Sequence, residues 1–193
     1  MLPTLVDYYE DYTDVYGSSA DIEEAKKLLS EAGYADGFDL EIMIPSNYEF
    51  HMQTGEVVVE QLKAAGINAK INGVEWNTWL NDCYKERNYT ASICGITSDM
   101  TPGYLLNRFQ TESSKNFINY SNADFDATYA KAAASLDLAE KAGYYKELQK
   151  LMAEDAGTAF LSVPPITVAI KPELEGYTFY PVYVQDMSVV KYK

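Results

Sequence analysis

Residues 89–109 read YTASICGITSDMTPGYLLNRF, and the rest of the chain is organised around this stretch. Its first part, residues 89–96, is rich in small and β-branched residues and is predicted to form a strand. Gly95 lies near the end of that strand, where a missing side chain lets another backbone approach closely. Pro102 and Gly103 then break the strand before a short apolar segment begins.

Asp99 follows the predicted strand directly. Ligands of α/β proteins collect outside the carboxyl ends of strands, so an acid at this place is a candidate ligand contact. By spacing alone, however, Asp99 is predicted to be a turn or helix-capping residue, and the ligand contact is the alternative.

Helix and strand patterns alternate before this stretch. Helices are predicted at residues 21–33, 52–65 and 76–84, and strands at residues 38–44 and 67–72. Asp21, together with Glu24, is expected to cap the first helix. The first strand is expected to bury only one face, and Met43 is expected to lie on the other face. The third helix is expected to have one apolar face, made by Trp76, Trp79, Leu80, Cys83 and Tyr84. The predicted fold class is therefore α/β, with a mixed sheet flanked by helices.

The pattern changes after residue 109. Ser121 with Asp124 is predicted to cap one helix, and Asp137 is predicted to open another. The inward faces of these two helices are expected to include Phe125, Tyr129, Ala132, Leu136, Leu138, Ala142, Tyr145, Leu148 and Met152. Residues 159–193 are predicted to be strand and turn with several prolines, and a boundary is predicted near residues 162–167.

Composition limits the partners. The 193 residues carry a formal net charge of −14, which disfavours nucleic acid and anionic membranes and suits cationic ligands. The sequence has no apolar run long enough to span a membrane. Its first residues do not read as a signal peptide, and they are expected to be the start of a fragment of a longer chain.

Catalytic and metal-binding motifs are not evident. Cys83 and Cys94 are predicted to be buried free thiols, and the single histidine, His51, cannot build a multi-histidine metal site. No nucleophile elbow, phosphate loop or zinc-protease motif occurs. A hydrolase that acts through a pair of carboxylates stays open as an alternative, because the 29 acids single out no pair.

Five ordered blocks, together with the C-terminal segment 169–179 (AIKPELEGYTF), resemble one family. The blocks are residues 25–40 (AKKLLSEAGYADGFDL), 59–67 (VEQLKAAGI), 74–80 (VEWNTWL), 120–126 (YSNADFD) and 144–155 (YYKELQKLMAED). Together they are similar to family 5 extracellular solute-binding proteins, the peptide-binding components of ABC importers. The C-terminal segment resembles the oligopeptide-binding branch in particular.

The resemblance implies a two-lobed fold of the periplasmic-binding-protein type (type II, cluster C). Residues 1–163 would be the ligand-binding second lobe, and residues 164–193 the hinge return and C-terminal tail that packs on a first lobe absent from this chain. The expected function is the receptor component of an ABC transporter. The expected partners are a peptide or other small solute and the permease subunits, and the expected location is the periplasm or the outer face of the cell membrane. No catalytic residue, metal or cofactor is implied.

The resemblance also implies a ligand site. Its expected residues are Trp76, Cys94, Gly95, Ile96, Thr97, Ser98 and Asp99. Asp99 matches the family acid that pairs with the α-ammonium group of the ligand, and residues 94–98 match the strand that offers backbone groups to a peptide. Trp76 matches a pocket tryptophan, while its helical spacing fits a core residue equally well.

The sequence also departs from the family pattern. Ile96 stands where peptide binders usually carry tryptophan, and Cys83 and Ile93 stand where the oligopeptide branch has arginines for ligand carboxylates. A non-peptide solute of the same family, such as a nickel chelate or a sugar, is therefore the alternative ligand.

Overall fold

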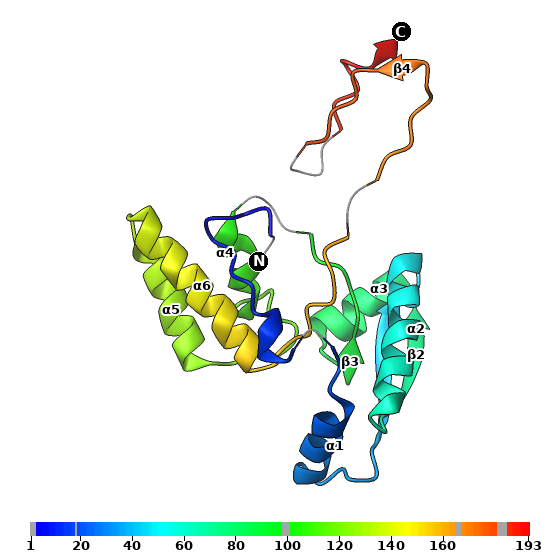
Figure 1. Ribbon diagram of the computed structural model, residues 1–193, viewed down its shortest axis with the longest axis vertical. Coiled ribbons are helices and arrows are strands. Elements are labelled where there is room, and N and C mark those ends of the chain that lie inside the picture. The colour runs from blue at the N-terminus through cyan, green and yellow to red at the C-terminus, as the bar shows by residue number, and fades with distance from the viewer. Residues whose placement is uncertain (1–2, 18, 98–100, 165–166, 181–184) are drawn as a thin grey trace. The chain divides into compact units, whose positions relative to one another are not determined.

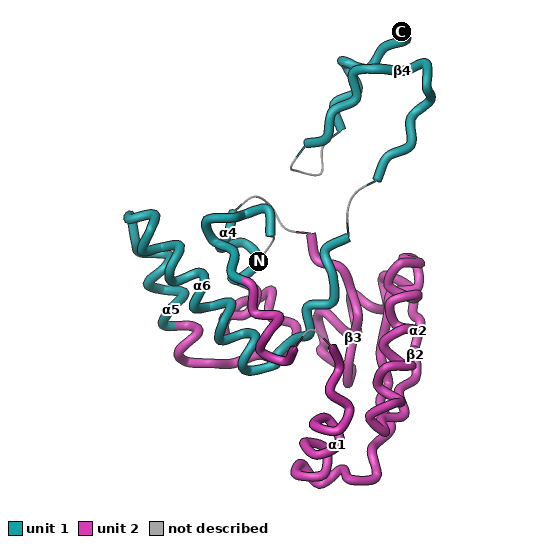
Figure 2. Tube along the Cα trace, viewed as in Figure 1, with its two compact units in different colours: residues 1–10, 98–107, 127–193 teal, residues 11–97, 108–126 magenta. Residues whose placement is uncertain are grey.

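The computed structural model describes residues 3–17, 19–97, 101–164, 167–180 and 185–193. The chain forms two compact units (Figure 2). We call residues 11–97 and 108–126 the sheet unit, and residues 1–10, 98–107 and 127–193 the helical unit. The predicted α/β class is confirmed: parallel strands are flanked by helices (Figure 1).

The sheet has three parallel strands in the order β2-β1-β3. β1 (Asp39–Pro45) is central and pairs along its whole length with β2 (Asn68–Val74). β3 is only Ala91–Ser92, much shorter than the predicted strand over residues 89–96. Pairing ends at Ser92, although Ile93 and Cys94 still pack against the apolar clusters of the sheet.

Both faces of β1 are covered. Ile42 and Ile44 face α2 (Glu49–Ala64) within one apolar cluster, whereas Met43 belongs to a second cluster with Trp79 and Phe117. Successive side chains of a strand point to opposite faces, so burial of residues 42–45 requires a layer on each side. The prediction of a strand buried on one face is therefore wrong for this half of β1.

Gly55 sets the approach of α2 to the sheet. A Cβ atom at Gly55 would lie 2.4 Å from Cδ1 of Ile44 and 3.2 Å from Cδ1 of Ile71. The small residue lets the helix backbone come close enough to bury both isoleucine side chains.

The predicted third helix is present as α3 (Trp76–Thr78) and a following π-helical segment, η2 (Trp79–Lys85). Trp79 and Cys83 are buried, which confirms the apolar face at these two positions. Trp79 donates from Nε1 to Oγ of Ser92 at 2.9 Å, and Ser92 donates in turn to the Met43 carbonyl at 2.8 Å.

α1 (Ile22–Glu31) has the predicted cap, because the Asp21 carboxylate accepts from the Glu24 amide at 2.9 Å. No residue of α1 is fully buried: Ile22, Ala25 and Leu29 are half-buried, and Leu28 is 54% exposed. A 3-10 turn, η1 (Thr13–Val15), precedes it.

The predicted cap of α5 (Ala123–Ala134) is wrong. The side chain of Asn122 accepts from the amides of Asp124 and Phe125 at 2.8 and 3.0 Å. Asn122 stands directly before the first helical residue, where a capping oxygen reaches the free amides of the first turn, whereas Ser121 is one position too early.

α6 (Leu138–Glu154) begins as predicted, because the Asp137 carboxylate accepts from the Glu140 amide. Tyr145, Leu148 and Met152 are buried as expected. Leu136 and Leu138 are 95% and 69% exposed, so their predicted inward placement is wrong. Leu136 lies in the break between the helices and Leu138 is the first residue of α6, so neither continues the apolar face beside it.

The helical unit also contains α4 (Pro102–Leu106), which is followed by the 3-10 turn η3 (Asn107–Phe109). The segment of residues 159–193 has two short antiparallel strands, β4 (Leu174–Glu175) and β5 (Lys191–Tyr192), among its described residues. Many of its apolar side chains are exposed, including Phe160, Leu161, Val163, Phe179, Met187 and Val189. The boundary predicted between residues 163 and 164 stays a prediction.

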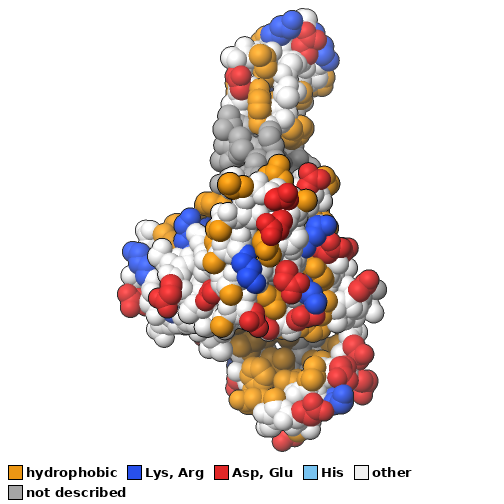
Figure 3. Space-filling model, turned by 90° about the vertical axis from the view of Figure 1, so that its left-hand side faces the viewer, with side chains coloured by type: hydrophobic (Ala, Val, Ile, Leu, Met, Phe, Trp, Pro, Cys, Tyr) orange, Lys and Arg blue, Asp and Glu red, His pale blue; other side chains and the backbone are white. Residues whose placement is uncertain are grey.

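One face of the molecule has acidic side chains spread over it with fewer basic ones between them (Figure 3). Within the described ranges, no helix combines the length and the hydropathy that crossing a bilayer requires.

Candidate functional site

The candidate site lies at the carboxyl edge of the three-stranded sheet. Because the strands are parallel, the segments that follow β1, β2 and β3 leave the sheet at the same edge. The amide of Ser46 donates to the Val74 carbonyl at 2.8 Å, and Oδ1 of Asn47 accepts from the Trp76 amide at 2.8 Å. These bonds join the end of β1 to the start of α3.

Three aromatic side chains are in contact at this edge. The Trp76 ring lies parallel to the buried Trp79 ring, with centroids 5.2 Å apart and planes 11° apart. Tyr48 meets Trp76 edge to face at 5.6 Å. Trp79 belongs to the core, whereas Trp76 is half-buried and Tyr48 is exposed, so both offer ring surface to solvent.

His51 lies next to these aromatics at the start of α2. Its ring centroid is 5.1 Å from that of Tyr48, and a Cβ atom on Gly95 would lie 2.8 Å from Nε2 of His51. A larger residue at position 95 would therefore collide with the imidazole. Nδ1 of His51 is buried and has no hydrogen-bond partner among the described residues.

The residues that follow β3 leave their backbone open. Gly95, Ile96 and Thr97 are exposed, and their backbones make no hydrogen bond to another described residue. β3 is also an edge strand of the sheet. Backbone donors and acceptors at an open sheet edge can pair with an extended chain.

Cys94 and Cys83 are free thiols, as predicted. Burial raises the pKa of the Cys94 thiol to about 12, and burial also raises the pKa of Cys83. Both thiols are protonated at neutral pH, so neither is activated for nucleophilic chemistry.

The structure thus brings Trp76, Cys94, Gly95, Ile96 and Thr97 to one edge of the sheet unit. Ser98 and Asp99, the other two predicted site residues, lie outside the described residues. Sequence reasoning missed Tyr48 and His51 as members of the edge. One signal was available, because His51 is the only histidine and follows a predicted strand by a few residues. Within the part of the chain that the structure describes, no group of acids, cysteines and histidine could hold a metal ion.

Burial lowers the pKa of His51 from its ordinary value near 6.5. Between the lowered pKa and 6.5 the unfolded chain binds more protons than the folded chain, so stability falls as the pH drops through this window. We expect the loss of stability between about pH 7.5 and about pH 5.5 to be smaller in His51→Gln than in the parent. Urea unfolding at both pH values measures this loss of stability, and equal losses in the parent and in His51→Gln would contradict the prediction.

The chain matches the model of one protein family, and it is similar in sequence to oligopeptide-binding proteins. Residues 1–117 match the model of the bacterial extracellular solute-binding proteins, family 5 Middle. The chain is 28% identical over 181 residues to the periplasmic oligopeptide-binding protein OppA of Haemophilus influenzae, a match that covers 88% of this chain and 33% of that protein. It is 26% identical over 174 residues to the oligopeptide-binding protein AppA of Bacillus subtilis, covering 82% of this chain and 32% of that protein.

The chain is also similar in structure to solved peptide-binding proteins. The Haemophilus influenzae OppA complex with the peptide RPPGFSPFR aligns with a TM-score of 0.69 at 28% identity, over 81% of this chain and 31% of that one. A dipeptide-binding protein from Pseudoalteromonas sp. SM9913 in complex with Met-Leu aligns with a TM-score of 0.69 at 25% identity, over 90% and 36%. The chain spans about a third of the length of these relatives. With more than half of its residues matched by the family model, the chain belongs to the family 5 bacterial extracellular solute-binding proteins.

Proposed function

We propose that this chain is the ligand-binding second lobe of a receptor that delivers peptides to an ABC importer. The observation that carries the proposal is the open backbone of residues 95–97 together with the exposed ring of Tyr48 and the half-buried ring of Trp76. An extended peptide gains affinity from main-chain hydrogen bonds to a strand edge, whatever its sequence. Aromatic surface beside that edge accepts many kinds of side chain.

We assign the ligand α-ammonium group to Asp99, which follows this open backbone in the sequence. A charge-assisted hydrogen bond between an ammonium and a carboxylate is worth roughly 1.5 to 3 kcal/mol. The net charge of −14 favours the approach of a cationic group to this protein as a whole.

The test compares a peptide that has a free amino group with the same peptide after N-acetylation. Calorimetry on this chain joined to its first lobe should show the free peptide binding about tenfold to a hundredfold more tightly. Asp99→Asn should abolish this preference, and Asp36→Asn, at an exposed acid between α1 and β1, should keep it.

Three outcomes decide the assignment. If the parent binds both peptides equally, Asp99 does not hold an amine. If Asp36→Asn abolishes the preference as well, the effect is one of overall charge. If no peptide binds, the ligand is a different solute; one relative of this chain, 28% identical over 187 residues, is the heme-binding protein A of Haemophilus influenzae.

Residues 164–193 support a second part of the proposal. Their exposed apolar side chains would lose their contact with water if they packed on a first lobe, as Phe179 and Val189 illustrate. A ligand that contacts both lobes would favour the form in which the lobes are closed around it. A permease could recognise this closed form in the periplasm or at the outer face of the cell membrane. The receptor would release its peptide chemically unchanged, so turnover of a labelled peptide would point to the hydrolase alternative.

A further inference from the structure

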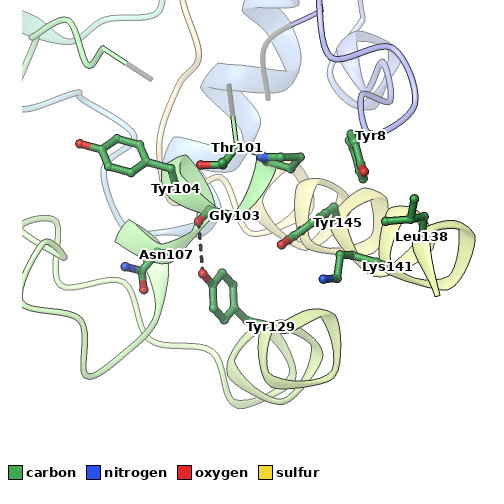
Figure 4. Close-up of a pocket in the computed structure, with 10 residues that line it drawn as sticks. Tyr8, Thr101, Gly103, Tyr104, Asn107, Tyr129, Leu138, Lys141 and Tyr145 are labelled. Atoms are coloured by element: carbon green, nitrogen blue, oxygen red, sulfur yellow. Dashed lines mark hydrogen bonds between the residues drawn. The ribbon is translucent and has the colours of Figure 1, made fainter. Parts of the chain in front are cut away.

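The helical unit contains a hollow of about 450 Å³. It lies between the N-terminal segment, α4, α5 and α6, and it is lined by Tyr8, Thr101, Pro102, Gly103, Tyr104, Asn107, Tyr129, Leu138, Lys141 and Tyr145 (Figure 4). This volume is in the range of sites that hold small organic molecules. All of these residues belong to the helical unit, whereas Tyr48, Trp76 and residues 95–97, the described part of the proposed peptide site, belong to the sheet unit.

The charge of this hollow differs from that of the chain. Among the described residues, Lys141 is the one charged residue that lines it and no carboxylate does, although the chain has 29 acids and 15 Lys and Arg residues. Lys141 makes no ion pair with a described residue. An ammonium group without a counter-ion in an aromatic hollow favours an anionic ligand.

Tyr145 provides a second polar group. Its side chain is buried, with the residue only 8% exposed, and its ring packs against Tyr8 with centroids 5.8 Å apart. The hydroxyl lies close to Gly103, since a Cβ atom there would be 2.9 Å away, yet it forms no hydrogen bond with any described residue. Because Tyr145 lines the hollow, its hydroxyl is a donor that a ligand there could use.

The hydroxyl of Tyr129, unlike that of Tyr145, has a hydrogen-bond partner among the described residues. Its hydroxyl donates to the Gly103 carbonyl at 3.2 Å, so its proton is already used. Figure 4 shows this bond, and shows the polar ends of Lys141 and Tyr145 directed toward the same space. Lys141 and Tyr145 therefore give the hollow a positive charge and a hydroxyl donor, with tyrosine rings as walls.

We propose that this hollow binds a small monocarboxylate that carries an aromatic or apolar body. The Lys141 ammonium and the Tyr145 hydroxyl match the single charge and two oxygens of a carboxylate. A phosphate would favour several cations or an arginine fork, and the hollow has neither. The rings of Tyr8 and Tyr129 suit the flat or apolar body of such a ligand.

The test titrates the 193-residue chain with phenylacetate and with 2-phenylethanol, a neutral alcohol with the same ring, by calorimetry. Phenylacetate should bind at least about tenfold more tightly. Lys141→Met should weaken phenylacetate about tenfold, and Tyr145→Phe, which keeps the buried ring, should weaken it several-fold. Lys131→Met is the matched control, because it removes the same charge from an exposed position of α5.

The control should bind phenylacetate like the parent. Equal affinity for the acid and the alcohol, equal losses in Lys141→Met and Lys131→Met, or no binding at all would overturn the proposal. Tighter binding of phenyl phosphate than of phenylacetate would overturn the choice of a carboxylate. Because Lys141 is not among the residues proposed to bind peptide, Lys141→Met should leave peptide binding unchanged, and a failure of one proposal leaves the other standing.

Discussion

Replacing Trp79 by alanine is expected to lower the free energy of unfolding by about 3–5 kcal/mol. Trp79 is 3% exposed, and its ring contacts Trp76, Tyr84 and Phe117 at centroid distances of 5.2 to 6.2 Å. Its indole N–H also donates to Ser92, so the substitution removes both buried apolar surface and the bridge between η2 and β3. Urea unfolding followed by circular dichroism measures the change.

Trp76→Ala is the matched control for Trp79→Ala. Trp76 has the same side chain three residues earlier, but it is half-buried at the carboxyl edge. Because part of its ring already contacts water, we expect its removal to destabilise the fold by no more than about half as much as the removal of Trp79. Equal losses in the two variants would show that Trp76 belongs to the core, and its assignment to the ligand site would then be wrong.

Replacing Gly37 by alanine is expected to destabilise the sheet unit by about 2–5 kcal/mol. Gly37 has a φ of +74°, and a Cβ atom at this position would lie only 1.9 Å from the Gly66 carbonyl oxygen. The loop before β1 and the loop before β2 meet at this point, and the Asn68 amide donates to the Phe38 carbonyl beside it at 2.9 Å. An added methyl group must push one backbone away from the other.

Gly33→Ala separates the effect of the positive φ from the effect of the collision with Gly66. Gly33 has a similar φ of +87°, but nothing lies within 4 Å of its missing Cβ atom. It should therefore show only the backbone strain, about 1–2 kcal/mol. The difference between the two variants, measured by thermal or urea unfolding, is the collision with Gly66, and losses of equal size would mean that the loops separate without penalty.

Local hydrogen bonding and periodicity explain what could be predicted from the sequence. Asp21 and Asp137 cap their helices because each cap needs only a side-chain oxygen next to its own backbone. Trp79 and Cys83 were found through helical spacing, since one buried face repeats every three to four residues. The alternation of these patterns was enough to predict the α/β class.

The rest depends on contacts between residues far apart in the chain. The joint between Asn47 and Trp76 spans 29 residues, and the approach of Gly95 to His51 spans 44, so neither follows from a local pattern. The length of β3 could not be predicted for the same reason, because a strand pairs only where its neighbour and the layers around it permit. At the candidate site, the pattern of residues 89–96 predicts the end of a strand, but only the fold places Tyr48 and His51 beside that end.

The uneven pairing of β1 has a consequence for the dynamics of the edge. β1 pairs with β2 from Asp39 to Pro45, but with β3 only at Ile42 and Met43. Segments with few backbone bonds open with a smaller free energy than the centre of a sheet, so the third strand is the natural place for local opening. A peptide that paired with this strand would extend the ladder and slow that opening. Part of its binding free energy would then be used to order its own docking surface.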